Sequence, residues 1–161
     1  MIRKVSIIVA VGMLLAANMQ AAAAQETGAL TSKIELEKSS PAAAGQPARK
    51  IYVAPDVVVP GDRVRITLIF TNRGAAPASG VNLVNPIPEG LLFDDTADSA
   101  GFAVSVDGGK SFGMLAALTV PVVGAGTRTA VAADVTHVRW LWPDAIAPDR
   151  SRSVAFFGRV R

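Results

Sequence analysis

The chain has 161 residues and no cysteine, and its 16 basic and 13 acidic residues give a formal net charge of +3. The missing cysteines exclude a disulfide-stabilised scaffold, and the small charge argues against a bulk nucleic-acid binder, which would be far more basic. We therefore expect one domain that is stabilised by packing alone, because a chain of this length has room for a single hydrophobic core.

The N-terminal region is typical of a secretory signal peptide. Arg3 and Lys4 precede an apolar run over residues 5–17, and four alanines follow at 21–24. A membrane anchor would need about 20 apolar residues, more than this run offers. We expect cleavage after Ala24, which would lower the net charge from +3 to +1 by removing two basic residues and leave no transmembrane segment. The expected location is periplasmic or secreted.

Residues 25–50 are expected to form a flexible N-terminal segment ahead of the folded domain. Alanine, serine and proline dominate their second half, as in a linker. Within the segment, residues 31–37 alternate, so that Ile34 and Leu36 fall on one side and charged residues on the other. This pattern predicts a possible edge strand over 31–37.

The remaining residues, 51–161, have the pattern of an antiparallel β domain. The segment 63–71 alternates most strictly, with Arg63 and Arg65 on its outward side and an inward set made of Val64, Ile66, Leu68 and Phe70. Further strands are predicted over 51–53, 57–59, 81–84, 102–106, 110–112, 135–142 and 153–161. Seven to nine strands without a helix predict an all-β, two-sheet antiparallel sandwich of the immunoglobulin-like kind.

Turn residues separate these strands. Pro86 and Pro88 prevent a helix after residue 84. Asp107, Gly108 and Gly109 tolerate positive φ angles, so we expect them to join 102–106 to 110–112 as a hairpin. Residues 115–134 are rich in Ala, Val, Thr and Gly and allow no clear assignment.

Several segments together resemble a known family. They are Pro60-Gly61-Asp62, 66–74, 76–78, 81–91 with Asn85-Pro86-Ile87-Pro88-Glu89-Gly90, 105–112 and 134–140. Over about 52–161 the chain is similar to the conserved-repeat domain of unknown function of bacterial and archaeal surface and secreted proteins. The resemblance implies an immunoglobulin-like β-sandwich without enzymatic activity, and it offers no catalytic residue to carry over. Family members often repeat the module in tandem, whereas this chain has one copy.

No group of residues in the sequence points to catalysis or to a cofactor. His137 is the only histidine, and the G-x-S-x-G motif of a nucleophile elbow is absent. His137 alternates with Val138 and Trp140, which places it on the outer face of its predicted strand. We therefore expect a protein that is not an enzyme.

The segment 105–112 also fits the short hairpin signature called the Asp-box, with Ser105, Asp107, Gly109, Ser111 and Phe112 in the required positions. In such hairpins the aspartate, glycine and aromatic residue fix the turn and take no part in chemistry. A propeller would repeat the unit in several blades, and here it occurs once. We interpret it as a structural hairpin, with a glycan-related role as the alternative.

Three carboxylates, Asp94, Asp95 and Asp98, lie close together in the sequence and are candidates for a calcium site. Their spacing lacks the pattern of a calcium-binding loop, so a solvated acidic loop is the simpler interpretation and we predict no bound metal. Trp142, beside Pro143 at a strand end, is a candidate for stacking on a sugar.

Basic residues form the last candidate site. Arg139, Arg159 and Arg161 are expected on neighbouring strands, where a shared patch would attract an anionic polymer. We favour the other interpretation, in which outward charges keep exposed strands from pairing between molecules.

The first functional hypothesis is an exported, non-catalytic module of the bacterial envelope with a structural role or with an envelope protein or polysaccharide as partner. It would act by edge-strand pairing or through a loop face. The second is a glycan-binding or calcium-dependent carbohydrate-interacting protein. An enzyme is the third, which the single histidine and the absence of cysteine disfavour.

Overall fold

The computed structural model describes residues 28–41 and 47–161, and the statements below concern these residues. The expected signal peptide over 1–24 lies outside them. Within the described part, no helix combines the length and the apolar character that a membrane crossing requires.

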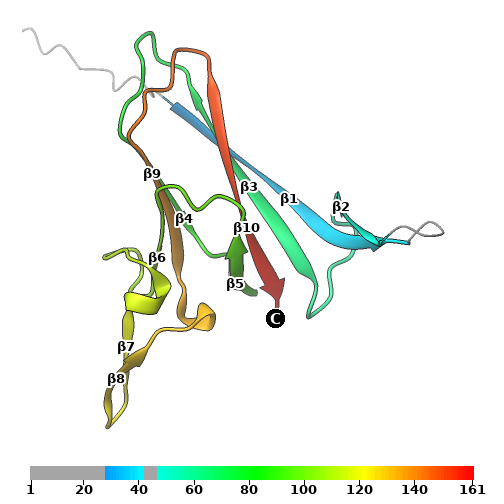
Figure 1. Ribbon diagram of the computed structural model, residues 1–161, viewed down its shortest axis with the longest axis vertical. Helices are drawn as coiled ribbons and strands as arrows, with labels where there is room; N and C mark the ends of the chain where they lie inside the picture. Colours follow the sequence, from blue (N-terminus) through cyan, green and yellow to red (C-terminus); the bar gives the residue numbers. More distant parts are fainter. Residues whose placement is uncertain (1–27, 42–46) are drawn as a thin grey trace, which may run out of the picture.

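The described chain forms ten strands and two short 3-10 turns, and every strand pair is antiparallel (Figure 1). One sheet has the order β2 (Arg49–Val53), β1 (Gly28–Ser40), β3 (Arg63–Asn72), β10 (Ser151–Val160) and β5 (Leu91–Thr96). A second has the order β4 (Val81–Pro86), β9 (His137–Trp142) and β6 (Phe102–Ser105). The hairpin of β7 (Thr119–Val122) and β8 (Gly126–Thr129) projects from the rest in Figure 1. The predicted all-β class with antiparallel sheets is confirmed.

The core draws on both larger sheets. From β3 it takes the predicted inward residues Val64, Ile66 and Leu68, while Phe70 is half-buried. From β9 it takes Val138, Trp140 and Trp142, and further members are Leu83, Phe93, Val104, Val154 and Phe156. Burying one such side chain completely stabilises the fold by roughly 1.5–3 kcal/mol. The alternation of β3 and β9 therefore supplies buried side chains from both sheets to the core of this domain without disulfides.

Trp140 lies at the centre of this core. Its ring centroid is 5.0 Å from that of Phe102 and 6.3 Å from that of Phe156. Its indole N–H donates to the backbone carbonyl of Asp98 at 2.8 Å, so the one polar atom of the side chain has a partner. This bond also fixes the loop after β5 against the core.

Strand β3 lies between strands from distant parts of the chain. Ile34 of β1 faces Ile66 of β3 on one side, and Phe156 of β10 faces Ile66 on the other. Long-range pairing of this kind holds the five-stranded sheet together.

The N-terminal strand differs from the prediction. It spans Gly28–Ser40 rather than 31–37, and β2 pairs only with its second half, so within the described residues the strand is central from Leu36 onward and an edge before it. Residues 39 and 40, which were assigned to a linker, pair with Lys50 and Arg49. Serine and charged residues do not indicate a strand by themselves, so the sequence did not predict that the strand continues here. Pairing with β2 holds these residues in it.

Two predicted short strands are absent, because their backbone groups bond locally. The N–H of Val59 donates to the Asp62 carboxylate at 2.9 Å and the N–H of Asp62 donates to the Val59 carbonyl at 3.0 Å, so 57–59 leads into a turn. The N–H groups of Lys110 and Ser111 donate to Asp107, and the hairpin closes through a single bridge between Val104 and Gly113.

The segment without a clear assignment contains four elements. They are the 3-10 turn η1 (Leu115–Ala117), the hairpin of β7 and β8, and the 3-10 turn η2 (Ala132–Asp134). These elements raise the strand count of the described residues above the predicted seven to nine.

Candidate functional site

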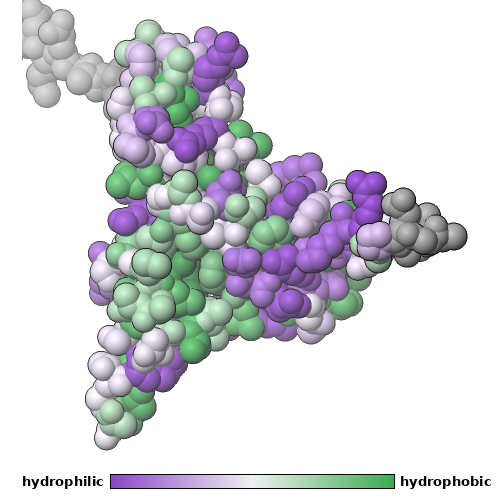
Figure 2. Space-filling model, in the orientation of Figure 1, coloured by the Kyte–Doolittle hydropathy of each residue, from purple (hydrophilic) through white to green (hydrophobic). Residues whose placement is uncertain are grey.

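The outer face of the five-stranded sheet carries a network of charged side chains that crosses all its strands. Arg63 donates to Glu37 and to Asp94, each at 2.6 Å. Lys50 approaches Glu37 at 3.0 Å, and Arg159 donates to Asp94 at 3.3 Å. Figure 2 shows hydrophilic residues gathered over β1, β3 and β10. The network therefore links β2, β1, β3, β10 and β5 from the outside.

Aromatic rings support the two central arginines. The guanidinium of Arg63 lies 3.9 Å from the ring centroid of Phe157, and that of Arg65 lies 3.7 Å from the ring centroid of Tyr52. A guanidinium above an aromatic face gains both packing and electrostatic stabilisation. The predicted placement of Arg63 and Arg65 on one outer face is confirmed, and both side chains are fixed there.

The carboxylates of this network are held in the ionised form. Hydrogen bonds from Lys33 and then from Arg65 lower the pKa of Glu35. For Glu37 and Asp94 burial alone would raise the pKa, but hydrogen bonds and the charges of Arg63 and its neighbours outweigh that effect and lower it. Each of these carboxylates has a basic partner within the sheet, so the ion pairs on this face stabilise the fold.

The three basic residues of the candidate patch do not share one sheet, because Arg139 is separated from the other two. Arg139 belongs to β9 of the three-stranded sheet, where its guanidinium lies 4.5 Å from the ring centroid of Phe112. Arg159 belongs to β10 of the other sheet and pairs with Asp94, and Arg161 follows the same strand. The expectation of a shared patch is wrong, because β9 and β10 follow each other in the chain but join different sheets.

The three candidate calcium ligands also have separate partners. Asp94 and Asp95 lie on β5 rather than in a loop, and Asp94 binds arginines. Asp95 accepts from the N–H of Thr96 at 2.8 Å, and Asp98 accepts from the N–H of Ala155 at 2.7 Å. Among the described residues, no group of three or more His, Cys, Asp or Glu side chains is placed to hold a metal ion.

Trp142 is 1% exposed, so its ring is not available for the sugar stacking for which it was a candidate. The alternation of β9 turns it into the core together with Val138 and Trp140. Arg152 lies over its ring, with 4.7 Å between the guanidinium carbon and the ring centroid. The proline that follows Trp142 ends the strand but does not expose the tryptophan.

The hairpin after β6 is organised around one carboxylate. Asp107 accepts from the hydroxyl of Ser105 at 2.7 Å and from the hydroxyl of Ser111 at 2.6 Å, besides the two backbone N–H groups described above. These bonds, with the Ser111 hydroxyl first, hold the pKa of Asp107 well below its usual range. The geometry agrees with the interpretation of the Asp-box as a turn. His137 lies beside it, half-buried, with Nδ1 3.1 Å from the Thr136 hydroxyl.

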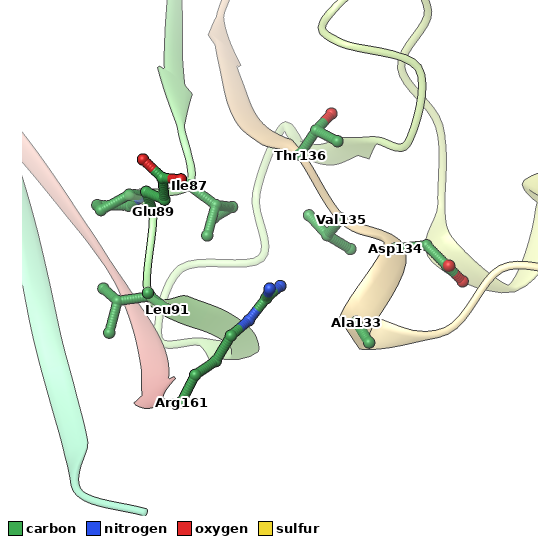
Figure 3. Close-up of a pocket in the computed structure, with 10 residues that line it drawn as sticks. Ile87, Glu89, Leu91, Ala133, Asp134, Val135, Thr136 and Arg161 are labelled. Carbon is green, nitrogen blue, oxygen red and sulfur yellow. The ribbon is translucent and has the colours of Figure 1, made fainter. Parts of the chain in front are cut away.

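A hollow of about 310 Å³ lies between the start of β5 and η2 (Figure 3). Ile87 and Leu91 line one side and Ala133 to Thr136 the other, and the Arg161 side chain extends between them in Figure 3. Asp134 points away from the hollow and binds Arg128 through two bonds of 2.7 Å. The hydrogen bonds from Arg128 lower the pKa of Asp134 to about 2. Arg161 is thus the candidate residue that the structure brings to a concave surface.

The most open part of the five-stranded sheet is the first half of β1. Strand β2 pairs only with Leu36 to Ser40, so within the described residues Gly28 to Glu35 pair with β3 alone. Five consecutive residues, 30–34, are exposed. Leu30 is 48% and Ile34 46% exposed, although both lie on the face that carries buried Leu36. Ile51 of β2, 42% exposed, continues this apolar strip.

Other strand edges of the described chain are shorter or protected. The outer strand β5 has six residues, a bulge against β10, and Asp94 and Asp95 within it. Strand β4 ends at Pro86, and the bridge to Gly113 covers part of β6. Bulges, charges and prolines keep exposed edges from pairing. Residues 28–35 carry no proline and no bulge, and their two charged residues, Lys33 and Glu35, bind each other, so they are the candidate interaction site.

Sequence reasoning missed this site, although part of the signal was visible. The alternation of Ile34 and Leu36 predicted a strand, but its start at Gly28 and its lack of cover depend on how far β2 extends.

No family model matches the chain, and the searches of curated proteins and of solved structures found no match. The resemblance to the conserved-repeat domain therefore stays a prediction.

Proposed function

We propose that this chain is an exported, non-catalytic, immunoglobulin-like β-sandwich that acts as a protein-interaction module of the bacterial envelope. The observation that carries the proposal is the edge of β1 over residues 28–35, which no other strand of the described part of the chain covers, with Leu30 and Ile34 exposed beside it. An extended segment of a partner can add to such an edge through backbone hydrogen bonds, and apolar side chains next to the edge supply specificity.

The sandwich part of the proposal has support in the core. Buried residues from β3 and β10 meet buried residues from β9 and β4 in one cluster, as expected when two sheets pack face to face. The charged network on the outer side of the five-stranded sheet holds β1 in place through Glu35 and Glu37. The open half of β1 is held by its pairing with β3, and an edge that is already ordered loses little conformational entropy when a partner strand is added.

Export is supported by the sequence of the first 24 residues. The alternative of a glycan-binding or calcium-dependent protein stays a prediction without a site, because Trp142 is buried and Asp98 and Asp94 are engaged in other bonds.

Photo-crosslinking in the native envelope tests the proposal. A photoreactive amino acid replaces Thr31 at the open edge, and a control places it at Val123, a fully exposed residue in the turn between β7 and β8. We expect a protein adduct from position 31 that is lost when Ile34→Lys is added, and none from position 123. Absence of an adduct at position 31, or equal adducts at both positions, would refute the proposal.

A further inference from the structure

We propose that the partner of the β1 edge is β1 of a second copy of this chain, so that two five-stranded sheets join into one continuous sheet around a two-fold axis. The inference rests on the proposed function, because it names the partner of the same edge. It is argued from the length of the edge, from the position of β2 and from the order of side chains along the strand.

The extent of the open edge limits where a second strand can lie. Residues 28–35 offer about 26 Å of backbone at about 3.3 Å per residue. Beyond Glu35 an added strand would meet β2, which occupies the same side of β1 from Leu36 onward. An antiparallel copy must therefore centre its pairing near the middle of this stretch, close to Thr31 and Ser32.

Symmetry restricts the register further. Side chains directly opposite each other in an antiparallel pair lie on the same face, and neighbours along a strand lie on opposite faces. A two-fold axis between two such strands therefore passes through a residue that faces its own copy. Near the middle of the edge the possible central residues are Thr31, Ser32 and Lys33.

Side-chain complementarity selects Ser32 as the central residue. With Ser32 facing its copy, Leu30 lies opposite Ile34 of the second chain and Ile34 opposite its Leu30, so the exposed apolar residues cover one another. On the other face Lys33 lies opposite Thr31. With Lys33 at the centre two lysines would face each other, which destabilises a strand pair. With Thr31 at the centre Ile34 would face Gly28 and stay exposed.

The charged residues beside the edge are compatible with this register. Lys33 is bound to Glu35 of its own strand at 2.7 Å, and Glu35 is also bound by Arg65, so no unbalanced charge enters the new ladder. The pairing centred on Ser32 spans residues 29–35, because Gly28 of the copy would fall opposite Leu36, where β2 begins. In it Glu35 lies opposite Ala29 and meets no second carboxylate. The strip of Leu30 and Ile34 from both copies becomes continuous across the axis.

The absence of cysteine from the natural chain permits a direct test of the register. Three variants, Ser32→Cys, Thr31→Cys and Lys33→Cys, are purified from the full-length sequence and oxidised mildly. We expect a disulfide-linked dimer from Ser32→Cys, whereas the two neighbours should stay largely unlinked, because their Cα atoms would be more than about 7 Å apart. Equal linkage in all three, or fastest linkage at a position other than 32, would overturn the proposed register.

The protein without cysteine tests the dimer itself. Light scattering after size-exclusion chromatography should give the mass of two chains, and Ile34→Lys should weaken dimerisation at least about tenfold, which is about 1.4 kcal/mol. The circular dichroism spectrum of Ile34→Lys should stay that of the β-rich protein, because Ile34 is already half exposed. The matched control Val123→Lys changes an exposed valine in the turn between β7 and β8 and should leave dimerisation unchanged.

A protein that is monomeric at tens of micromolar and gives no linkage at position 32 would overturn this inference. If position 31 then still crosslinks to a different envelope protein, the proposed function stands and only the identity of the partner is wrong. If neither a dimer nor an envelope adduct forms, both proposals fail.

Discussion

The two halves of β1 have similar strand-forming sequences and very different surroundings. Glu35 and Leu36 are buried, and β2, Arg63 and Arg65 cover the strand from Leu36 onward and bind its carboxylates. Residues 30–34, which come directly before this buried pair in the strand, are all exposed. Alternation along a strand therefore predicts which residues share a face, but the cover on that face comes from other parts of the chain.

The largest difference between the halves is expected in core packing. Leu36→Ala should lower the free energy of unfolding by about 2–5 kcal/mol, because it removes a side chain of the core and leaves a cavity. Leu30→Ala, the same change in the open half, should alter it by no more than about 0.5 kcal/mol at concentrations low enough to keep the protein monomeric. Urea unfolding followed by tryptophan fluorescence measures both. Equal losses of unfolding free energy in Leu36→Ala and Leu30→Ala would show that the two halves of β1 do not differ in packing.

A smaller effect is expected from the charged network that holds only the second half. Arg63→Met leaves Glu37 and Asp94 without their shared partner and should cost about 1–3 kcal/mol in the same unfolding experiment. Arg128→Met removes an equally short pair at a more exposed place and serves as the matched control. A loss from Arg128→Met as large as that from Arg63→Met would show that the network does not brace the sheet.

The network should also make stability depend on pH. Glu35, Glu37 and Asp94 have a lowered pKa in the folded chain. In the unfolded chain such carboxyl groups titrate near pH 4, so the unfolded state binds more protons below that value. The free energy of unfolding should be constant above about pH 5 and fall as the pH is lowered through 4. In Arg63→Met the fall should be shallower; an unchanged acid profile would argue against the pairing.

The smallest effect is expected where the two halves meet. Lys33 is well exposed and is the largest contributor to the lowered pKa of Glu35. Lys33→Gln should therefore raise the pKa of Glu35 toward its ordinary value while Arg65 still holds it in place, with a change in stability within about 0.5 kcal/mol. A carboxyl-detected NMR titration follows the pKa. An unchanged pKa of Glu35 in Lys33→Gln would show that Arg65 alone lowers it.

The sequence predicted those parts of the fold that depend on local pattern. Val64, Ile66 and Leu68 alternate with polar residues and are buried, and Val138 alternates with His137 in the same way. Asp107 was identified as the residue of a turn, and its carboxylate organises that turn. In each case the neighbours along the chain hold enough information.

The candidate sites depended on partners that the sequence does not reveal. Arg139 and Arg159 are twenty residues apart on successive strands, and only the topology shows that those strands belong to different sheets. The sequence around Asp94 does not indicate a partner for its carboxylate, because Arg63, which binds it, lies far away in the chain. The open edge of β1 likewise exists because β2 ends where it does.

The place of β10 between β3 and β5 has a consequence for how the molecule reaches its final form. The last strand of the chain supplies the only link through which β5 joins the sheet in the described structure. Assembly thus waits for residues 151–160, and pairing over such sequence distances is slow compared with the closing of local hairpins. The five-stranded sheet of the described structure therefore cannot be complete before residues 151–160 are available to pair with both β3 and β5.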